Sequence, residues 1–90
     1  MVSSQWEVYM IETSSGKLYT GITTNVERRF SEHQSQQKGA RFFYTDEARR
    51  IVYREKCANR SEASKRENAI KKLSAKDKWA LVTEVSTDGL

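Results

Sequence analysis

The chain has few of the residues from which small proteins build cross-links and metal centres. Its 90 residues include one cysteine, Cys57, and one histidine, His33. A single cysteine excludes an intramolecular disulfide and a cysteine-rich zinc site, and a single histidine excludes a site of clustered histidines. Chains without a disulfide framework are typical of reducing compartments, so we expect a cytoplasmic location.

Proline is absent, glycine occurs four times, and long hydrophobic runs are missing. No apolar stretch approaches the roughly 20 residues that cross a bilayer. Residues 1–7 lack the basic start and apolar stretch of a secretory signal. We therefore expect no membrane partner. Without a linker or repeat, a chain of this length predicts one domain, which we place at residues 1–85, with residues 86–90 as a flexible tail.

Positive charge is concentrated in the middle of the chain. The net charge is +4, yet residues 28–56 carry eight Lys and Arg against four Asp and Glu, and residues 57–78 carry seven against three. Such a stretch favours a polyanionic partner, most simply nucleic acid. The alternative is a solvated surface whose charges pair with one another, and composition alone does not decide between the two.

Alternating residues near the N-terminus predict a β-hairpin. The segments 6–12 and 17–22 are rich in aromatic and β-branched residues, and Gly16 in the turn between them suits a positive φ. If the residue numbers of paired positions add to an even total, Tyr9 and Tyr19 share one face of the hairpin, whereas a one-residue slip separates them. The sequence leaves that register open.

Three capping patterns predict three helices. Thr24, Asn59 and Ser74 are each followed three residues later by an acidic residue, which matches a capping box or a close variant. We predict helices over residues 25–36, 60–73 and 75–85, with a loop at 36–47 and a short strand at 51–53 between the first two. The order β-β-α-β-α-α indicates a small α+β fold with helices covering a three-stranded sheet.

Helical spacing places three polar residues beside apolar ones. The first helix has a buried stripe of apolar residues at four-residue spacing, Ile22, Val26 and Phe30. Arg29 and His33 are four apart and border this stripe. Glu67 lies within the apolar face of the second helix, where a carboxylate must be paired, coordinated to a metal or left at the rim of a cleft. A salt bridge to Arg29 or to a neighbouring lysine is the structural alternative.

The order of these residues resembles the GIY-YIG nuclease superfamily. The resemblance covers residues 6–82 and is carried by the segments Glu7–Tyr9, Tyr19–Gly21, Gly21–His33 and Ser61–Leu73. The chain is similar to small stand-alone bacterial members that are related to the N-terminal nuclease domain of the UvrC excinuclease. Glu-Val-Tyr replaces Gly-Ile-Tyr in the first motif, and Ile22 stands where some active members have lysine.

The resemblance implies a three-stranded antiparallel sheet flanked by helices and hydrolysis of phosphodiester bonds in DNA, in repair or recombination. It implies one divalent metal ion, Mg²⁺ or Mn²⁺, bound by Glu67. It also implies that Tyr9 is a candidate general base, that Tyr19 orients water or phosphate, and that Arg29 contacts the scissile phosphate while His33 supports a proton relay.

These roles agree with elementary chemistry. A guanidinium presents a planar, permanently charged fork to phosphate oxygens. Magnesium takes oxygen ligands and keeps several waters, so one carboxylate can anchor it. A tyrosine with a pKa near 10 needs help to act as a base at neutral pH. We expect further contacts to the nucleic-acid backbone from six residues, Gly21, Lys38, Arg41, Arg49, Arg50 and Arg54.

Two alternatives remain at this point. The chain either cleaves DNA or keeps the nuclease fold as a nucleic-acid-binding module whose cleavage is weak or depends on a protein partner. A third interpretation, from another class, is a basic adaptor for an acidic protein. The salt dependence of binding separates the nucleic-acid-binding module from the basic adaptor. Binding to nucleic acid releases counterions, so its affinity falls steeply as the salt concentration rises.

Overall fold

The computed structural model describes residues 5–35 and 46–88, and side chains as far as residue 83. A three-stranded antiparallel sheet in the order β2-β1-β3 lies at its centre. The strands are β1 (Trp6–Thr13), β2 (Leu18–Thr23) and β3 (Ala48–Cys57). The predicted α+β class and the order β-β-α-β-α-α are confirmed.

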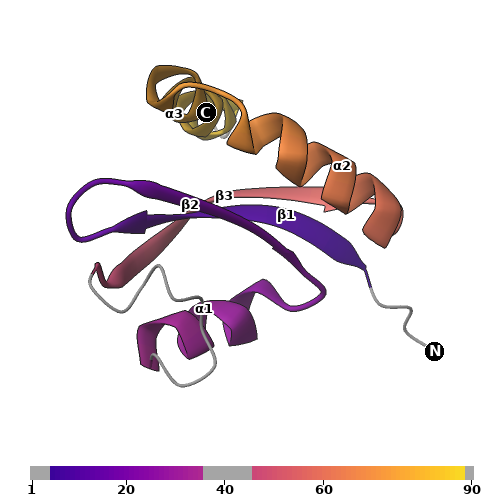
Figure 1. Cartoon of the computed structure of the whole chain (residues 1–90), viewed down its shortest axis with the longest axis horizontal. Helices are drawn as coiled ribbons and strands as arrows, with labels where there is room; N and C mark the ends of the chain where they lie inside the picture. The colour runs from indigo at the N-terminus through magenta and orange to yellow at the C-terminus, as the bar shows by residue number, and fades with distance from the viewer. Residues whose placement is uncertain (1–4, 36–45, 89–90) are drawn as a thin grey trace.

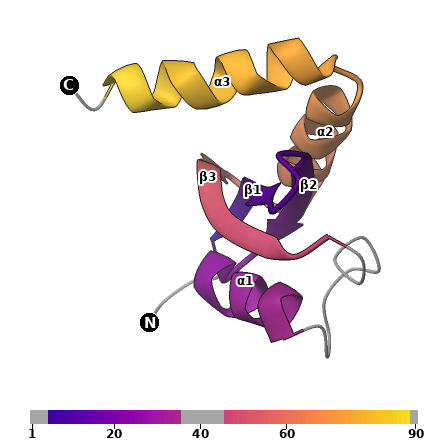
Figure 2. The ribbon, with the colours of Figure 1, turned by 90° about the vertical axis from the view of Figure 1, so that its left-hand side faces the viewer.

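Helices cover both faces of the sheet (Figures 1 and 2). They are α1 (Val26–Ser35), α2 (Arg60–Lys71) and α3 (Ala75–Asp88). Helix α1 lies on one face, and α2 and α3 lie together on the other. Within residues 5–35 and 46–88, no helix combines the length and apolar composition needed to cross a bilayer. The third helix runs past the predicted end at residue 85, to Asp88.

The hairpin register places the two tyrosines on one face. Tyr9 pairs with Gly21, and Ile11 pairs with Tyr19, so the paired residue numbers have the even total that the sequence left open. Gly16 has a φ of +90° in the turn, as expected. Tyr9 and Tyr19 are thus diagonal neighbours on adjacent strands, close enough for aromatic rings to interact.

The third strand is longer than predicted. It has ten residues, and only its centre corresponds to the short strand expected at residues 51–53. Its register against β1 shifts between Met10 and Ile11 and again between Glu12 and Thr13. These bulges interrupt the period of two, which explains why the flanking basic residues lack a strand-like pattern. The predicted loop at 36–47 lies largely outside the described residues.

Two of the three predicted helix caps are confirmed. Asn59 Oδ1 accepts a hydrogen bond from Glu62 N at 2.9 Å, and Ser74 Oγ accepts one from Asp77 N at 3.1 Å. At the first helix, the prediction of Thr24 is wrong by one residue, because Asn25 Oδ1 caps the helix by accepting from Arg28 N at 3.0 Å.

Each face of the sheet has its own core. On the α2–α3 face the buried side chains are Val8, Met10, Tyr53, Cys57, Ala63, Ile70 and Val82. On the α1 face they are Tyr9, Ile11, Val26 and Ala48, with Tyr19, Phe30 and Ile51 packed against them. Ile22 was predicted to extend the stripe of α1, but it pairs with Val8 and packs on the opposite face. Helical spacing does not continue backwards into a strand, where the side-chain period is two.

Candidate active site

The hydroxyl of Tyr9 is the centre of a buried polar cluster on the α1 face. Tyr9 is 1% exposed, and its oxygen lies 3.0 Å from His33 Nε2. The Arg29 guanidinium lies near enough to the Tyr9 oxygen to act against the rise of its pKa. Burial, and next the proximity of Tyr19, raise the pKa of Tyr9. The phenol is therefore neutral at physiological pH.

The hydrogen bond between Tyr9 and His33 can form with either neutral tautomer of the imidazole. The Tyr9 hydroxyl donates when His33 Nε2 is the unprotonated ring nitrogen and accepts when Nε2 carries the hydrogen. Burial, with the charge of Arg29 adding to it, lowers the pKa of His33 to about 4. The imidazole is therefore neutral at physiological pH.

The position of His33 differs from the sequence prediction. His33 was expected beside Arg29 at the border of the buried stripe, but it is fully buried. Arg29 does lie at the border, with its side chain 32% exposed, and it pairs with Glu32 at 2.8 Å. The guanidinium thus lies near the buried phenol while the side chain still reaches solvent.

Gly21 makes room for the Tyr9 hydroxyl. A Cβ placed on Gly21 would lie 2.6 Å from the Tyr9 oxygen and 2.8 Å from Cζ of the same ring. Any larger residue at this position must push the phenol away from its partners. The sequence indicated Gly21 only as the end of a motif and as a nucleic-acid contact. The structure adds a steric reason for glycine.

Tyr19 completes the aromatic part of the cluster. Its ring centroid lies 5.2 Å from that of His33, edge to face, and 6.3 Å from that of Tyr9. Unlike Tyr9, Tyr19 is only half-buried, so it stands between the buried pair and solvent. The structure thus brings together four of the five predicted chemical residues, Tyr9, Tyr19, Arg29 and His33.

Glu67 lies on α2, which covers the other face of the sheet. Its charge makes a minor contribution to the raised pKa of Tyr9, and its carboxylate pairs with Lys71 Nζ at 3.0 Å. The side chain of Glu67 is 18% exposed, so the predicted inward setting agrees with the structure. Of the two partners expected for a salt bridge, Arg29 or a neighbouring lysine, the lysine is the one observed.

The donor set around Glu67 fits a hydrated hard cation. In the part of the chain that the structure describes, no three His, Cys, Asp or Glu side chains form a ready metal cage. A zinc site needs three or four such ligands. Magnesium retains several waters and takes the rest of its oxygens from carboxylate and substrate phosphate. Glu67, which already holds an ammonium group, would be the protein anchor of such an ion.

The basic residues of β3 are less available than their charge suggested. Arg50 pairs with Glu12 at 2.6 Å. Arg54 pairs with Glu7 at 2.9 Å and with Glu27 at 2.5 Å, and so ties β3 to β1 and α1. Sequence reasoning missed this network, although Glu7 and Glu27 both precede the basic stretch that begins at residue 28.

Of the other three basic residues expected to contact phosphate, the structure describes one. Arg49 is exposed on β3, whereas Lys38 and Arg41 lie outside the described residues. Glu32, which holds Arg29 in place, was also missed. Its position three residues after Arg29 on the same helix is the pattern that would have found it.

Comparison with known proteins agrees with this geometry. Residues 5–80 match the family described as the GIY-YIG catalytic domain. A UPF0213 protein of Desulfotalea psychrophila is 54% identical over 77 residues, which cover 86% of this chain and 70% of that protein. A UPF0213 protein of Cupriavidus pinatubonensis is 38% identical over 84 residues, covering 93% and 92% of the two chains.

A solved structure shows the same fold. The solution NMR structure of a UPF0213 protein from Bacillus halodurans superposes with a TM-score of 0.55 at 34% identity, covering 88% of this chain and 83% of that one. The tyrosine cluster, the steric role of Gly21 and these similarities lead to one conclusion. The chain belongs to the GIY-YIG family and has its nuclease fold.

Proposed function

We propose that the protein is a metal-dependent endonuclease that hydrolyses phosphodiester bonds in DNA. The observation that carries the proposal is the Tyr9 hydroxyl, which is buried against Gly21, lies 3.0 Å from neutral His33 and is near the charge of Arg29. A buried polar centre of this kind costs stability unless every member is satisfied. Its placement beside an arginine that reaches solvent suits a reaction at phosphate.

Arg29 is the proposed phosphate ligand. Its guanidinium has five N–H donors in a fixed plane, and one of them pairs with Glu32 at 2.8 Å. The planar fork and the permanent charge suit two oxygens of a scissile phosphate. Glu32 keeps the group oriented before substrate arrives, which reduces the entropy lost on binding.

Tyr9 and His33 form the proposed proton path. As water attacks phosphorus, the Tyr9 oxygen takes a proton from water and passes its own hydroxyl proton to His33 Nε2. Because the phenolate never accumulates, the raised pKa of Tyr9 does not block this relay. Part of the depression of the His33 pKa comes from Arg29. A phosphate bound to Arg29 would offset that charge and make His33 a better proton acceptor.

Glu67 is the proposed metal anchor, and Tyr19 the group that orients water or phosphate at the solvent side of the cluster. When bound, a divalent ion would neutralise charge on the phosphate and stabilise the leaving oxygen. Arg49, together with Lys38 and Arg41, is proposed to follow the DNA backbone. Arg50 and Arg54 join them only if phosphate replaces their carboxylate partners.

A second candidate function is DNA binding without efficient cleavage. The observation in its favour is the raised pKa of Tyr9. A phenol that resists ionisation is a weak general base at neutral pH.

The test is nicking of supercoiled plasmid with magnesium, with manganese and with EDTA, by the parent and by Glu67→Gln. The substitution keeps the shape of the side chain and removes the charge, so we expect nicking to fall about 100-fold or more. The lost pair with exposed Lys71 contributes only about 0.3–0.5 kcal/mol, so the melting temperature should change by no more than about 4 °C.

Glu62→Gln is the matched control, since Glu62 lies on the same helix and is exposed. It should nick like the parent. A stable Glu67→Gln protein that nicks normally would refute the metal assignment. A parent that binds DNA but fails to nick it with either divalent ion would establish the binding module instead.

A further inference from the structure

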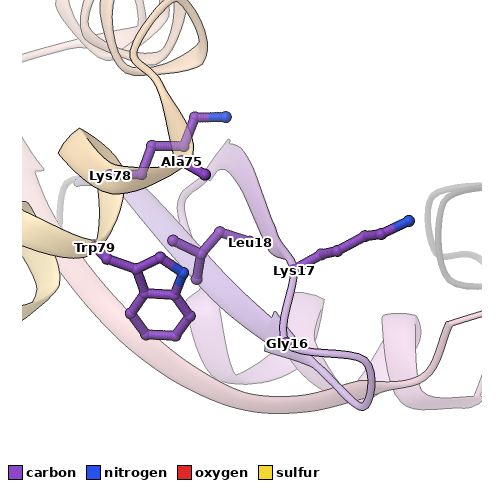
Figure 3. A pocket seen from close by; sticks show the side chains of 6 residues that line it. All are labelled: Gly16, Lys17, Leu18, Ala75, Lys78 and Trp79. Atoms are coloured by element: carbon purple, nitrogen blue, oxygen red, sulfur yellow. The ribbon is translucent and has the colours of Figure 1, made fainter.

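A hollow of about 290 Å³ opens between the β1–β2 turn and the start of α3. Figure 3 shows the residues that line it, Gly16, Lys17, Leu18, Ala75, Lys78 and Trp79. Leu18 packs with the core on the α2–α3 face, whereas Tyr19, the next residue, packs on the α1 face. The hollow is therefore separate from the Tyr9 cluster but shares the edge strand β2 with it.

The walls of the hollow are apolar and its rim is cationic. The Trp79 indole lies beside the Leu18 side chain, and the side chains of Lys17 and Lys78 extend away from it. Neither ammonium group forms a salt bridge with any residue that the structure describes. The charge of Asp46, whose carboxylate accepts hydrogen bonds from Ser15, does reach Lys17.

The turn leaves the hollow open. Gly16 contributes only backbone, and a Cβ there would meet no atom within 4 Å. The volume is at the lower limit of small-molecule sites, which span roughly 300–1,000 Å³. The hollow is thus sized for one flat group, with two positive charges at its mouth.

We propose that this hollow binds an unpaired nucleobase of the nucleic-acid substrate, with the adjoining phosphates on Lys17 and Lys78. The inference rests on the proposed function for the identity of the polymer. Aromatic side chains combined with basic groups are the usual means of holding single strands. An acidic peptide would satisfy the lysines, but its flexible carboxylate side chains would leave the apolar walls uncovered.

The position of the hollow defines the class of substrate. Leu18 and Gly21 are three residues apart on β2, which is about 10 Å along the strand. The hollow opens on the α2–α3 face and Arg29 lies on the α1 face, so a nucleic-acid strand that occupied both would pass around the edge strand β2. The preferred substrate is therefore DNA with an unpaired segment near the bond that is cleaved.

The test uses the fluorescence of Trp79 without metal, so that no cleavage occurs. The chain has two tryptophans, and Trp6→Phe leaves Trp79 as the sole reporter. In EDTA, a 20-nucleotide single strand should quench this fluorescence saturably. A blunt duplex of the same sequence and a polyglutamate peptide should quench it weakly or not at all.

Substitution of the two lysines tests the rim. Lys17→Gln with Lys78→Gln should lower the slope of log affinity against log salt by about 1.4, the value for two phosphate contacts on a single strand. Lys72→Gln with Lys76→Gln removes the same charge from exposed residues that do not line the hollow, and it should change the slope much less. Trp79→Leu, checked for folding by its melting temperature, should weaken binding of a labelled single strand about tenfold or more.

The outcomes separate this proposal from the proposed cleavage. Equal quenching by duplex or peptide, no quenching by the single strand, or equal slopes for the two lysine pairs would overturn the base site. Quenching by the single strand in a protein that never nicks plasmid would refute the endonuclease and leave the base site standing. Nicking of plasmid without quenching of Trp79 by the single strand would refute the base site and leave the endonuclease standing.

Discussion

The two faces of the sheet each contain a buried tyrosine whose hydroxyl meets a polar network, but the networks differ. On the α2–α3 face, Tyr53 donates to Glu55 at 2.5 Å, and Arg66 pairs with the same carboxylate at 2.9 Å. On the α1 face, Tyr9 meets neutral His33 and the cation of Arg29. In the first network the charges of Glu55 and Arg66 cancel each other near the surface. In the second network the Tyr9 phenol is buried beside Arg29, whose side chain still reaches solvent.

The contrast shows how one central strand serves two purposes. Along β1, Val8 and Met10 enter the apolar core, and Tyr9 enters the polar cluster between them. Because successive side chains alternate between faces, the polar cluster does not interrupt the apolar core. We expect loss of the Tyr53 hydroxyl to change stability and loss of the Tyr9 hydroxyl to change chemistry.

The largest expected difference is between Tyr9→Phe and Tyr53→Phe. Each change removes one hydroxyl and keeps the ring. Loss of the proton path should lower nicking by Tyr9→Phe about 10²–10⁴-fold. Loss of one hydrogen bond should cost Tyr53→Phe about 1 kcal/mol of unfolding free energy and leave nicking intact. Equal nicking rates, measured with magnesium on both folded proteins, would contradict the division between the faces.

The next expected effect is that of Gly21→Ala. The new methyl group would displace the Tyr9 hydroxyl, because a Cβ has only 2.6 Å to that oxygen. A displacement of about 1 Å at a reacting group lowers the rate about 100-fold. Gly16→Ala is the control for backbone strain, since its Cβ meets open space at a φ of +90°, and it should lower the melting temperature without displacing the Tyr9 hydroxyl. If Gly21→Ala nicks at the parent rate, cleavage does not depend on the observed position of the Tyr9 hydroxyl.

The pH dependence of stability should show the neutral state of His33. Its pKa is about 4 in the fold against 6.5 ordinarily. Between these values the unfolded chain binds a proton that the folded chain does not, so stability should fall as the pH falls from about 6.5 towards 4. The full loss is roughly 3 kcal/mol, at about 1.4 kcal/mol for each pKa unit.

Melting temperatures measured between pH 4 and 7 test this predicted loss of stability. The parent is compared with His33→Gln as the matched variant. Glutamine can still accept from Tyr9 but does not titrate, so its curve should be flatter. The chain has no other histidine to confuse the comparison. Parallel curves for the two proteins would mean that His33 is protonated as readily inside the fold as outside it.

The smallest expected effect is that of Lys71→Gln. Its ammonium pairs with Glu67 and would compete with a metal ion for that carboxylate. An exposed pair at this spacing is worth about 0.3–0.5 kcal/mol, so its removal should tighten the binding of manganese about twofold. Titration of Mn²⁺ by electron paramagnetic resonance measures this directly. Weaker binding in the variant would show that Lys71 supports the site rather than competing with the ion.

Much of the fold was predictable because its determinants are local. The hairpin follows from alternation and a glycine turn, and two helix starts follow from capping residues that the structure confirms. The third strand was predicted too short because two bulges break its period. The pairing of Arg54 with Glu7 and Glu27 joins residues 47 and 27 positions apart, and no local pattern encodes such contacts.

The candidate site was predictable in its membership but not in its geometry. The spacing of Arg29 and His33 placed both on one helix face, yet the full burial of His33 depends on β1 and β2 packing over it. The register of the hairpin decides whether the two tyrosines meet, and the sequence left it open. The clash distance at Gly21 likewise exists only once that register is fixed.

The central place of β1 has a consequence for synthesis of the chain. β2 follows β1 directly, but the other partner of β1 is β3, which ends at Cys57. At about 5–20 residues per second, the 44 residues from Thr13 to Cys57 take roughly 2–9 s to translate. During that interval the emerging hairpin exposes an unpaired backbone edge and both apolar sides. A nascent chain that stalls before β3 is complete is therefore the form most prone to aggregate.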